Sequence, residues 1–222
     1  MKPEKKRILI TVKAYPNPSK KYGETVCCAG VDLNNSQLVR LYPIPFRDLD
    51  NDKKFKKYSI IEVDCFLPSD DKRPESFRVN ADTINVVDLL DTEKGTWAKQ
   101  SPSDQKAREA CYAQLSFFDK KKDAIEGIPF NFYYKFKCAG VSNCPGHKLS
   151  IIDWEIGQSY RDWRAKYPAE QVLLEKIKQR WLDISNTARK DVYFYVGNMK
   201  RFRKTFIILG VFYPSVDKET SK

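Results

Sequence analysis

The residues best suited to chemistry lie in one ten-residue stretch near the middle of the chain, from Cys138 to His147. It holds two of the six cysteines, Cys138 and Cys144, and the only histidine of the sequence, His147. Thiolate sulfur and imidazole nitrogen are ligands that Zn²⁺ takes in structural sites. Glycine and proline residues in the same stretch favour tight turns, which would bring the three side chains together. The spacing therefore predicts most of a tetrahedral zinc site.

A structural zinc site takes four ligands, and this stretch supplies three. We expect Cys27, from the Cys27–Cys28 pair of an upstream strand, to be the fourth ligand, with Cys65, Cys111 and Asp153 as alternatives. Two other interpretations stay open. One is a catalytic metal with three protein ligands and a water molecule, and the other is a pair of ordinary buried thiols beside a surface histidine.

A second candidate site is a run of cations between two strand-like segments near the end of the chain. Four of the five residues from 200 to 204 are basic, and the fifth is Phe202. Lysine and arginine pair with phosphates, and a phenyl ring can stack on an unpaired base. The run predicts a nucleic-acid-binding hairpin tip, the alternative being a solvated turn whose phenylalanine packs on the core. The predicted contacts are Lys200, Arg201, Phe202, Arg203 and Lys204 in the tip, Lys135 and Lys137 on a nearby strand, and Arg40 and Arg47 in the first part of the chain.

The overall charge agrees with an anionic partner. The 222 residues carry a formal net charge of +11 with a pI near 9.3, and such a balance favours DNA or RNA. No apolar run approaches the ~20 residues that cross a bilayer, and the basic N-terminus lacks the apolar stretch of a signal peptide. We therefore expect a cytoplasmic protein with reduced cysteines and no membrane partner.

Two alternatives to simple nucleic-acid binding remain. One is a metal-dependent nuclease that uses His147 with Asp153 and Glu155, two acids that alternate along a predicted strand. The sequence carries no Walker-type phosphate loop, no nucleophile elbow and no dinucleotide-binding fingerprint. The other is a non-catalytic subunit that docks a protein partner through the aromatic residues of the second lobe.

The first part of the chain, residues 1–94, has the pattern of a small β-barrel. Strand-like segments cover 8–13, 24–31, 37–43, 58–66 and 76–90, and one short helix is expected over 46–55. The segments 24–31 and 37–43 flank a turn and predict a hairpin. Several short strands with one short helix suggest a PUA-like, OB-like or SH3-like barrel, and the sequence does not choose among them.

The rest of the chain is predicted to form a connector and a second lobe. Residues 95–127 are expected to be a helical connector with a helix from Asp104 to Phe118, and residues 215–222 a flexible tail. The second lobe, residues 128–214, is expected to combine antiparallel strands with packed helices. Its predicted elements are strands over 132–138 and 149–154, a helix over 168–185 that buries Val172, Leu173, Ile177, Trp181 and Ile184, and a hairpin of 191–197 with 205–213. The sequence as a whole predicts an α+β fold.

Overall fold

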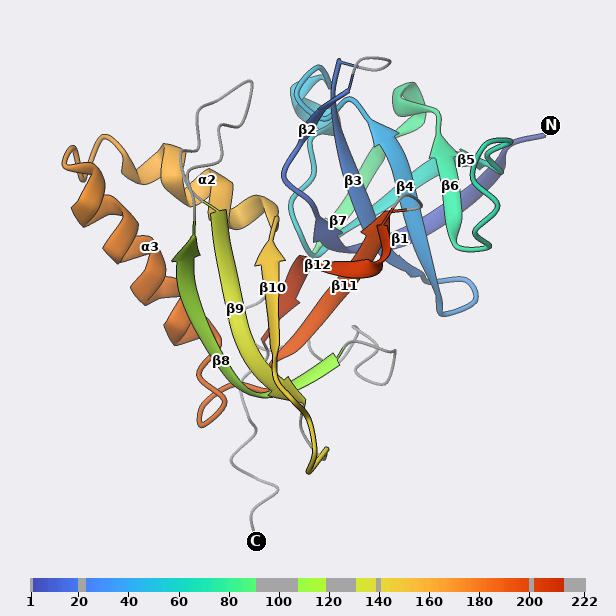
Figure 1. Ribbon diagram of the computed structural model, residues 1–222. Coiled ribbons are helices and arrows are strands. Elements are labelled where there is room, and N and C mark those ends of the chain that lie inside the picture. Colours follow the sequence, from blue (N-terminus) through green and yellow to red (C-terminus); the bar gives the residue numbers. More distant parts are fainter. Residues whose placement is uncertain are drawn as a thin grey trace, which may run out of the picture. The chain divides into compact units, whose positions relative to one another are not determined.

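The chain divides into two compact units, residues Met1–Gln105 and Lys106–Lys222. The computed structural model describes residues 2–19, 23–90, 108–118, 131–138, 141–199 and 202–213 (Figure 1). The predicted tail, the first part of the predicted connector and residues 119–127 lie outside the described residues. Both units are built on β-strands, and the α-helices of the described residues belong to the second unit, so the predicted α+β class is confirmed.

The first unit is a sheet that closes on itself. Its strands are β1 (Glu4–Lys13), β2 (Asn17–Ser19), β3 (Gly23–Asp32), β4 (Gln37–Ile44), β5 (Ser59–Phe66), β6 (Ser76–Val79) and β7 (Asn85–Leu89), with short 3₁₀ turns η1 (Asn51–Lys53) and η2 (Ala81–Thr83). Because β1 pairs with both β3 and β5, the strands β1, β3, β4, β6 and β5 form a closed circuit. The pairing of β4 with β6 is parallel, and the other pairings of the circuit are antiparallel. The predicted barrel-like lobe and its β3–β4 hairpin are thereby confirmed.

Close contact between β1 and β3 depends on Gly30. A Cβ atom at this position would lie 2.2 Å from the backbone oxygen of Leu9 and 2.9 Å from the side chain of Ile8. Real Cβ atoms do not approach a backbone oxygen that closely, so only glycine fits. Ile8 and Leu9 are themselves fully buried, which places this contact in the core of the unit.

The segment between β4 and β5 fills one part of the core without forming the predicted helix. Only η1 is helical here, so the helix expected over 46–55 is wrong in extent. Turn-favouring aspartates compete with a helix in so short a segment, because a helix must first form a costly nucleus. Phe46, Leu49 and Phe55 are nevertheless buried, and the rings of Phe46 and Phe55 meet edge to face at 5.1 Å.

The second unit is also a closed barrel. Its elements are β8 (Arg108–Phe118), β9 (Asn131–Cys138), β10 (His147–Ile151), α2 (Trp154–Trp163), α3 (Glu170–Ile184), β11 (Tyr193–Met199) and β12 (Phe202–Phe212). The strands close in the order β10-β12-β11-β8-β9, with β10 and β12 parallel. The predicted hairpin of β11 and β12 is confirmed, although the predicted strand over 149–154 begins earlier and ends at Ile151, where α2 takes over.

The helix predicted from Asp104 to Phe118 is wrong over its described part, because residues 108–118 form β8. The segment pairs antiparallel with β9, and its alternate apolar residues lie at register positions opposite inward residues of that strand. Ala113 is opposite Phe136, Leu115 opposite Tyr134 and Phe117 opposite Phe132. The sequence fits both a helical and an alternating pattern, and pairing with β9 favours the strand because an unpaired strand edge leaves backbone groups unsatisfied.

The helices of the second unit complete its core. The α3 residues Leu173, Ile177, Trp181 and Ile184 are buried as predicted, whereas Val172 is 47% exposed and does not belong to the buried face of the helix. The buried Tyr134 hydroxyl donates a 2.6 Å hydrogen bond to the carbonyl oxygen of Trp181, which fixes α3 against β9.

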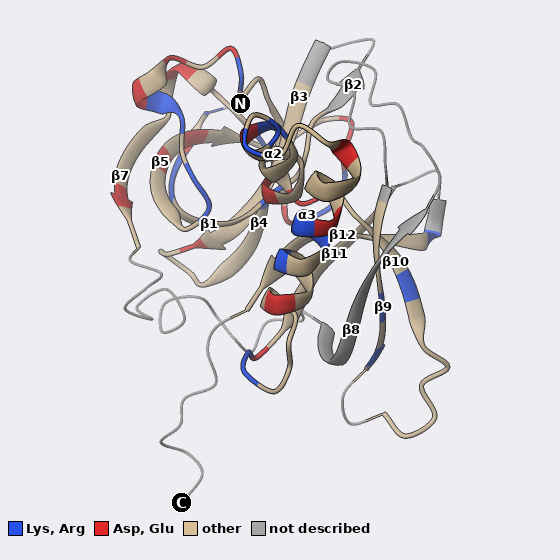
Figure 2. Ribbon diagram, turned by 90° about the vertical axis from the view of Figure 1, so that its left-hand side faces the viewer, with Lys and Arg blue, Asp and Glu red and all other residues tan. Residues whose placement is uncertain are grey.

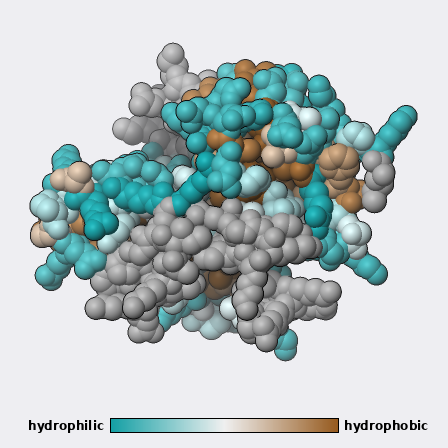
Figure 3. All heavy atoms as spheres, turned by 90° about the horizontal axis from the view of Figure 1, so that it is seen from above, coloured by the Kyte–Doolittle hydropathy of each residue, from teal (hydrophilic) through white to brown (hydrophobic). Residues whose placement is uncertain are grey.

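Seen from above, the described surface is mainly hydrophilic, with hydrophobic residues gathered in a smaller area (Figure 3).

The two units share one strand order. If the strands of each closed circuit are numbered along the chain, the ladder in both units runs first, second, third, fifth, fourth and back to the first. The parallel pairing joins the third strand to the fifth in both units. This is the Greek-key order of the OB-fold. Of the three barrel types that the sequence left open for the first lobe, the structure therefore has the OB-like one, and the second unit repeats it.

Candidate metal centre and basic face

Three potential metal ligands meet in the loop between β9 and β10. The Nε2 atom of His147 lies 3.4 Å from the Sγ atoms of both Cys138 and Cys144, and the three ligand atoms lie within 4.8 Å of one another. Tetrahedral bonds of ~2.3 Å to sulfur and ~2.05 Å to nitrogen would set the sulfur–nitrogen distance at about 3.5 Å. The geometry fits, so this group could hold a metal ion.

Strand pairing and a turn at Gly146 bring the three ligands together. Cys138 is the last residue of β9 and His147 the first of β10, where it pairs in register with Phe136. Between them Gly146 adopts a φ of +87°, a conformation that L side chains rarely adopt. The ring of His147 packs against that of Phe136 at 5.2 Å between centroids, which restricts its orientation.

The polar surroundings of Cys144 suit a thiolate. The backbone N–H of Cys138 donates a hydrogen bond to the Sγ atom of Cys144 at 3.4 Å. This hydrogen bond and one from the backbone of Gly146 lower the pKa of the Cys144 thiol. A metal-binding cysteine must be deprotonated, so hydrogen bonds of this kind favour the ligating form.

The predicted fourth ligand, Cys27, lies in β3 of the first unit. Its half-buried thiol is beside the guanidinium group of Arg40, and burial raises the pKa of this thiol. A neutral thiol next to a fixed positive charge is a poor setting for a metal cation. The role of Cys27 stays a prediction, and within the described residues the group that could hold a metal ion consists of Cys138, Cys144 and His147.

The outer face of β9 and β10 is basic. Along β9 the inward residues Phe132, Tyr134 and Phe136 are buried, whereas Lys135 and Lys137 are exposed as predicted.

Lys148 extends this face from β10. It is exposed and pairs in register with Lys135, and its ammonium group lies 5.3 Å from the centre of the Tyr133 ring. Neither strand contains an acidic residue, and Figure 2 shows blue but no red segments on both. Sequence reasoning missed Lys148, although the alternation of residues 147–151 with those of β9 could have indicated it.

The predicted hairpin tip is described only in part. Lys200 and Arg201 lie outside the described residues, as do the side chains of Phe202 and Arg203. Lys204, on β12, is exposed. The tip joins β11 to β12, which are the fourth and fifth strands of the second barrel.

The two arginines predicted as contacts in the first unit are half-buried. Arg40 lies on β4 and forms an ion pair with Asp71 at 3.2 Å. Arg47 follows β4 and has buried Nε and Nη2 atoms. Both guanidinium groups are therefore partly shielded from solvent.

The acids of the nuclease alternative do not share a strand face, because α2 begins at Trp154. Asp153 is the N-cap of α2 and is fully buried, and its two carboxylate oxygens accept hydrogen bonds from the backbone N–H groups of Glu155 and Val211, each at 3.0 Å. Glu155 lies in the first turn of the helix. Asp153 therefore joins α2 to β12, a structural role that differs from holding a catalytic metal.

Comparison with known proteins places the chain in two families without assigning an activity. Residues 72–222 match the family described as Domain of unknown function (DUF8757), and residues 4–114 match Domain of unknown function (DUF8758). The chain belongs to both. No curated protein matches its sequence. Within the described residues, no helix has the length and apolar character needed to span a bilayer.

A DNA-binding protein is among the solved structures that match. Titled "Structure of murine DNA binding protein bound with ds DNA", it shares 10% sequence identity with this chain. The match covers 97% of this chain and 99% of that chain at a TM-score of 0.29. A likeness at this TM-score does not indicate a function.

Proposed function

We propose that this protein binds nucleic acid through the outer face of β9 and β10 together with the β11–β12 tip. The observation that supports this most is the set of exposed lysines on that face, Lys135, Lys137 and Lys148, on strands without acidic residues. Lysine ammonium groups neutralise backbone phosphates and release counterions, which is the main source of affinity for DNA and RNA. The aromatic ring of Tyr133 lies among them and offers a surface on which a base could stack.

The position of this face in the barrel supports the same proposal by analogy of fold. In OB-folds, oligonucleotides and oligosaccharides bind on the second and third strands, with the loop between the fourth and fifth strands beside them. Here β9 and β10 are the second and third strands, and residues 200–204, four of them basic, span the turn after the fourth strand and the start of the fifth. Because the cations of this face and of residues 200–204 attract negative charge, an oligonucleotide is favoured over an oligosaccharide as the ligand.

The proposal includes a structural Zn²⁺ held by Cys138, Cys144 and His147. Bound there, the ion would fix the end of β9 to the start of β10 and so hold the lysine-bearing hairpin in one shape. Zinc binding requires both thiols deprotonated and the imidazole neutral, so its affinity is expected to fall as pH decreases.

A matched pair of triple variants tests the nucleic-acid face. We expect replacement of Lys135, Lys137 and Lys148 by Gln to weaken binding of labelled single- and double-stranded DNA and RNA, measured by fluorescence anisotropy over a range of salt. The slope of log affinity against log salt should decrease by about one for each lysine that contacts phosphate.

The control removes the same charge from elsewhere in the unit. Lys166→Gln, Lys176→Gln and Arg180→Gln change three exposed cations on or next to α3. Wild-type affinity in this control, with loss in the first variant, supports the proposal. Equal loss of affinity in both variants would mean that only net charge matters. Wild-type affinity in the variant of Lys135, Lys137 and Lys148 would contradict the proposed face.

Metal content tests the zinc part separately. We expect about one equivalent of zinc per chain in the purified protein, lost on Cys144→Ser and retained on Cys65→Ala, which changes a buried thiol of the first unit. Zinc retained by Cys144→Ser would contradict the assignment. A Cys27→Ser variant tests the predicted fourth ligand by the same measurement.

A further inference from the structure

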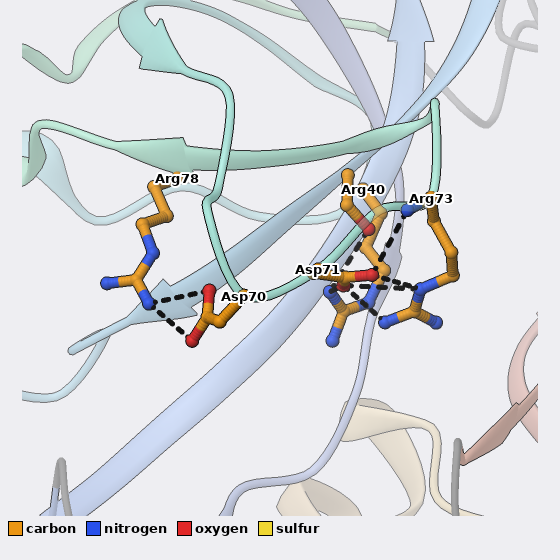
Figure 4. Close-up of polar contacts among 6 residues, drawn as sticks. Arg40, Asp70, Asp71, Arg73 and Arg78 are labelled. Carbon is orange, nitrogen blue, oxygen red and sulfur yellow. Dashed lines mark hydrogen bonds and ion pairs between the residues drawn. The ribbon is translucent and has the colours of Figure 1, made fainter. Parts of the chain in front are cut away.

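A cluster of two arginines and one aspartate lies on the first unit, separate from the face proposed above. Asp71 accepts hydrogen bonds from Arg73 at Nε and Nη2, the shortest at 2.6 Å, and from Arg40 at Nη1 at 3.2 Å (Figure 4). Figure 4 shows the two guanidinium groups side by side, both directed to this one carboxylate.

Asp71 has little capacity left to accept hydrogen bonds. Its Oδ1 atom accepts from the backbone N–H and the Nε of Arg73, and its Oδ2 atom accepts from Nε and Nη2 of Arg73 and from Nη1 of Arg40. A carboxylate offers about four lone-pair positions, and an arginine five N–H donors. Donors on both arginines therefore exceed what Asp71 can accept.

The charge of the cluster is also unbalanced. Asp71 stays ionised, because the hydrogen bonds from Arg73 hold the pKa of its carboxyl group well below the ordinary value. The neighbouring Cys27 does not add a negative charge, since burial raises the pKa of its thiol. Two guanidinium groups thus share one carboxylate. Glu75 acts on Arg73 only through longer-range attraction, and no ion pair joins them within the described residues.

Several contacts hold Arg40 in place before any ligand arrives. Its guanidinium carbon lies 4.8 Å from the centre of the Tyr42 ring, and its Nη1 atom lies 3.4 Å from the Oγ atom of the buried Ser76. The side chain is 22% exposed and that of Arg73 is 44% exposed. The pair is therefore both preorganised and accessible, as a planar anion-recognition site requires.

The cluster occupies the same place in its barrel as the lysine face does in the second unit. Arg40 lies on β4, the third strand of the first barrel, and Cys27 on β3, the second strand. Asp71 and Arg73 lie in the segment that joins β5 to β6, the fourth and fifth strands. Two strands and one loop thus converge on the position where OB-folds bind their ligands.

We propose that Arg40 and Arg73 form a phosphate-binding site on the first unit, in which Asp71 orients both guanidinium groups and the phosphate supplies the missing negative charge. The phosphate group could belong to free phosphate, to the end of a nucleotide or to a nucleic-acid backbone. This site is distinct from the proposed β9–β10 face and stands whether or not that face binds nucleic acid.

The test follows the arginine Nε–Hε signals of the full-length protein by ¹⁵N NMR during addition of inorganic phosphate at constant ionic strength. Signals of Arg40 and Arg73 should shift and saturate, whereas that of Arg78 should not. Arg78 is the matched control, because it pairs with Asp70 at 2.8 Å in the same region but outside the cluster. Parallel shifts of Arg73 and Arg78 would indicate general screening and overturn the proposal.

Two variants and two further ligands complete the test. Arg73→Gln should weaken phosphate binding by about tenfold or more, the scale of a lost charge-assisted hydrogen-bond pair, whereas Arg78→Gln removes the same charge and should leave it unchanged. A nucleoside 5′-monophosphate and a dinucleoside monophosphate without a terminal phosphate distinguish terminal from backbone phosphate, and saturable binding of any of the three probes supports the site. Absence of saturable shifts with all three, or unaltered binding in Arg73→Gln, would refute it.

Discussion

The two units share one strand order. They differ in the segment that packs between their third and fourth strands and in the charged side chains that they carry. Between the third and fourth strands the first barrel has a short segment anchored by Phe46 and Phe55, whereas the second has the helices α2 and α3. On the second and third strands and their neighbouring loop, the first unit pairs its arginines with Asp71, whereas the second unit carries the exposed lysines Lys135 and Lys148. Strand order thus fixes which strands and which loop lie together, and the side chains on them differ between the two barrels.

The largest expected effect concerns the closure of the first barrel. Gly30→Ala would place a methyl group 2.2 Å from the backbone oxygen of Leu9, and backbone cannot move aside as a flexible side chain can. We expect a loss of more than about 3 kcal/mol in the free energy of unfolding. Denaturant unfolding followed by circular dichroism measures it, with Ala29→Ser as the neighbouring control. A loss below about 1 kcal/mol would contradict the assigned β1–β3 contact.

A second prediction compares caps in the two units. Asp153→Asn in the second unit should cost about 2–3 kcal/mol, because an amide can no longer accept from both backbone N–H groups in a fully buried position. Asn80 caps η2 in the first unit, and its side chain accepts a hydrogen bond only from the backbone N–H of Asp82. Asn80→Ala should therefore cost about 1 kcal/mol or less in the free energy of unfolding. Urea unfolding of both variants makes the comparison, and equal losses would show that burial of Asp153 adds nothing.

How far the sequence predicts this molecule depends on whether local pattern and tertiary pairing agree. The β3–β4 hairpin, α3 and the β11–β12 hairpin have clear periodicity and turn residues, so local pattern predicts them. The apolar residues of 108–118 fit both a helical and an alternating strand pattern, and only the pairing with β9 shows which of the two forms. Closure of either barrel depends on pairings far apart in the chain, such as β1 with β5, which no local pattern reports.

The candidate sites divide in the same way. The Cys138–His147 stretch was predictable because its three ligands lie close together in the sequence. Asp153 was misassigned as a strand-face acid because the change from β10 to α2 occurs within two residues of it. The Arg40–Asp71–Arg73 cluster joins a strand to a distant loop, so only the fold brings it together.

A third prediction concerns the turn of the metal centre. Gly146→Ala should cost about 1–2 kcal/mol, because an L side chain is strained at a φ of +87° although space for a methyl group exists. The same variant should weaken zinc binding, measured by competition with a chromogenic chelator. Ser142→Ala, an exposed change in the same loop, is the control. Unchanged zinc affinity in Gly146→Ala would mean that this turn does not position the ligands.

The smallest expected effect on stability belongs to the lysine face. Replacing Lys135, Lys137 or Lys148 singly by Gln should change the free energy of unfolding by no more than about 0.5 kcal/mol, as for most exposed positions. Thermal unfolding of each variant checks this. A loss above 1 kcal/mol at any of them would mean that the side chain serves the fold, and the binding assay would then need a milder substitution at that position.

A chemical-shift map of the full-length protein with a short oligonucleotide tests the central claim most directly. The account predicts that backbone amide signals of β9 and β10, with those around residues 200–204, shift on addition of the oligonucleotide while those of α3 do not. Shifts concentrated on α3, or no saturable shifts on β9 and β10, would contradict it.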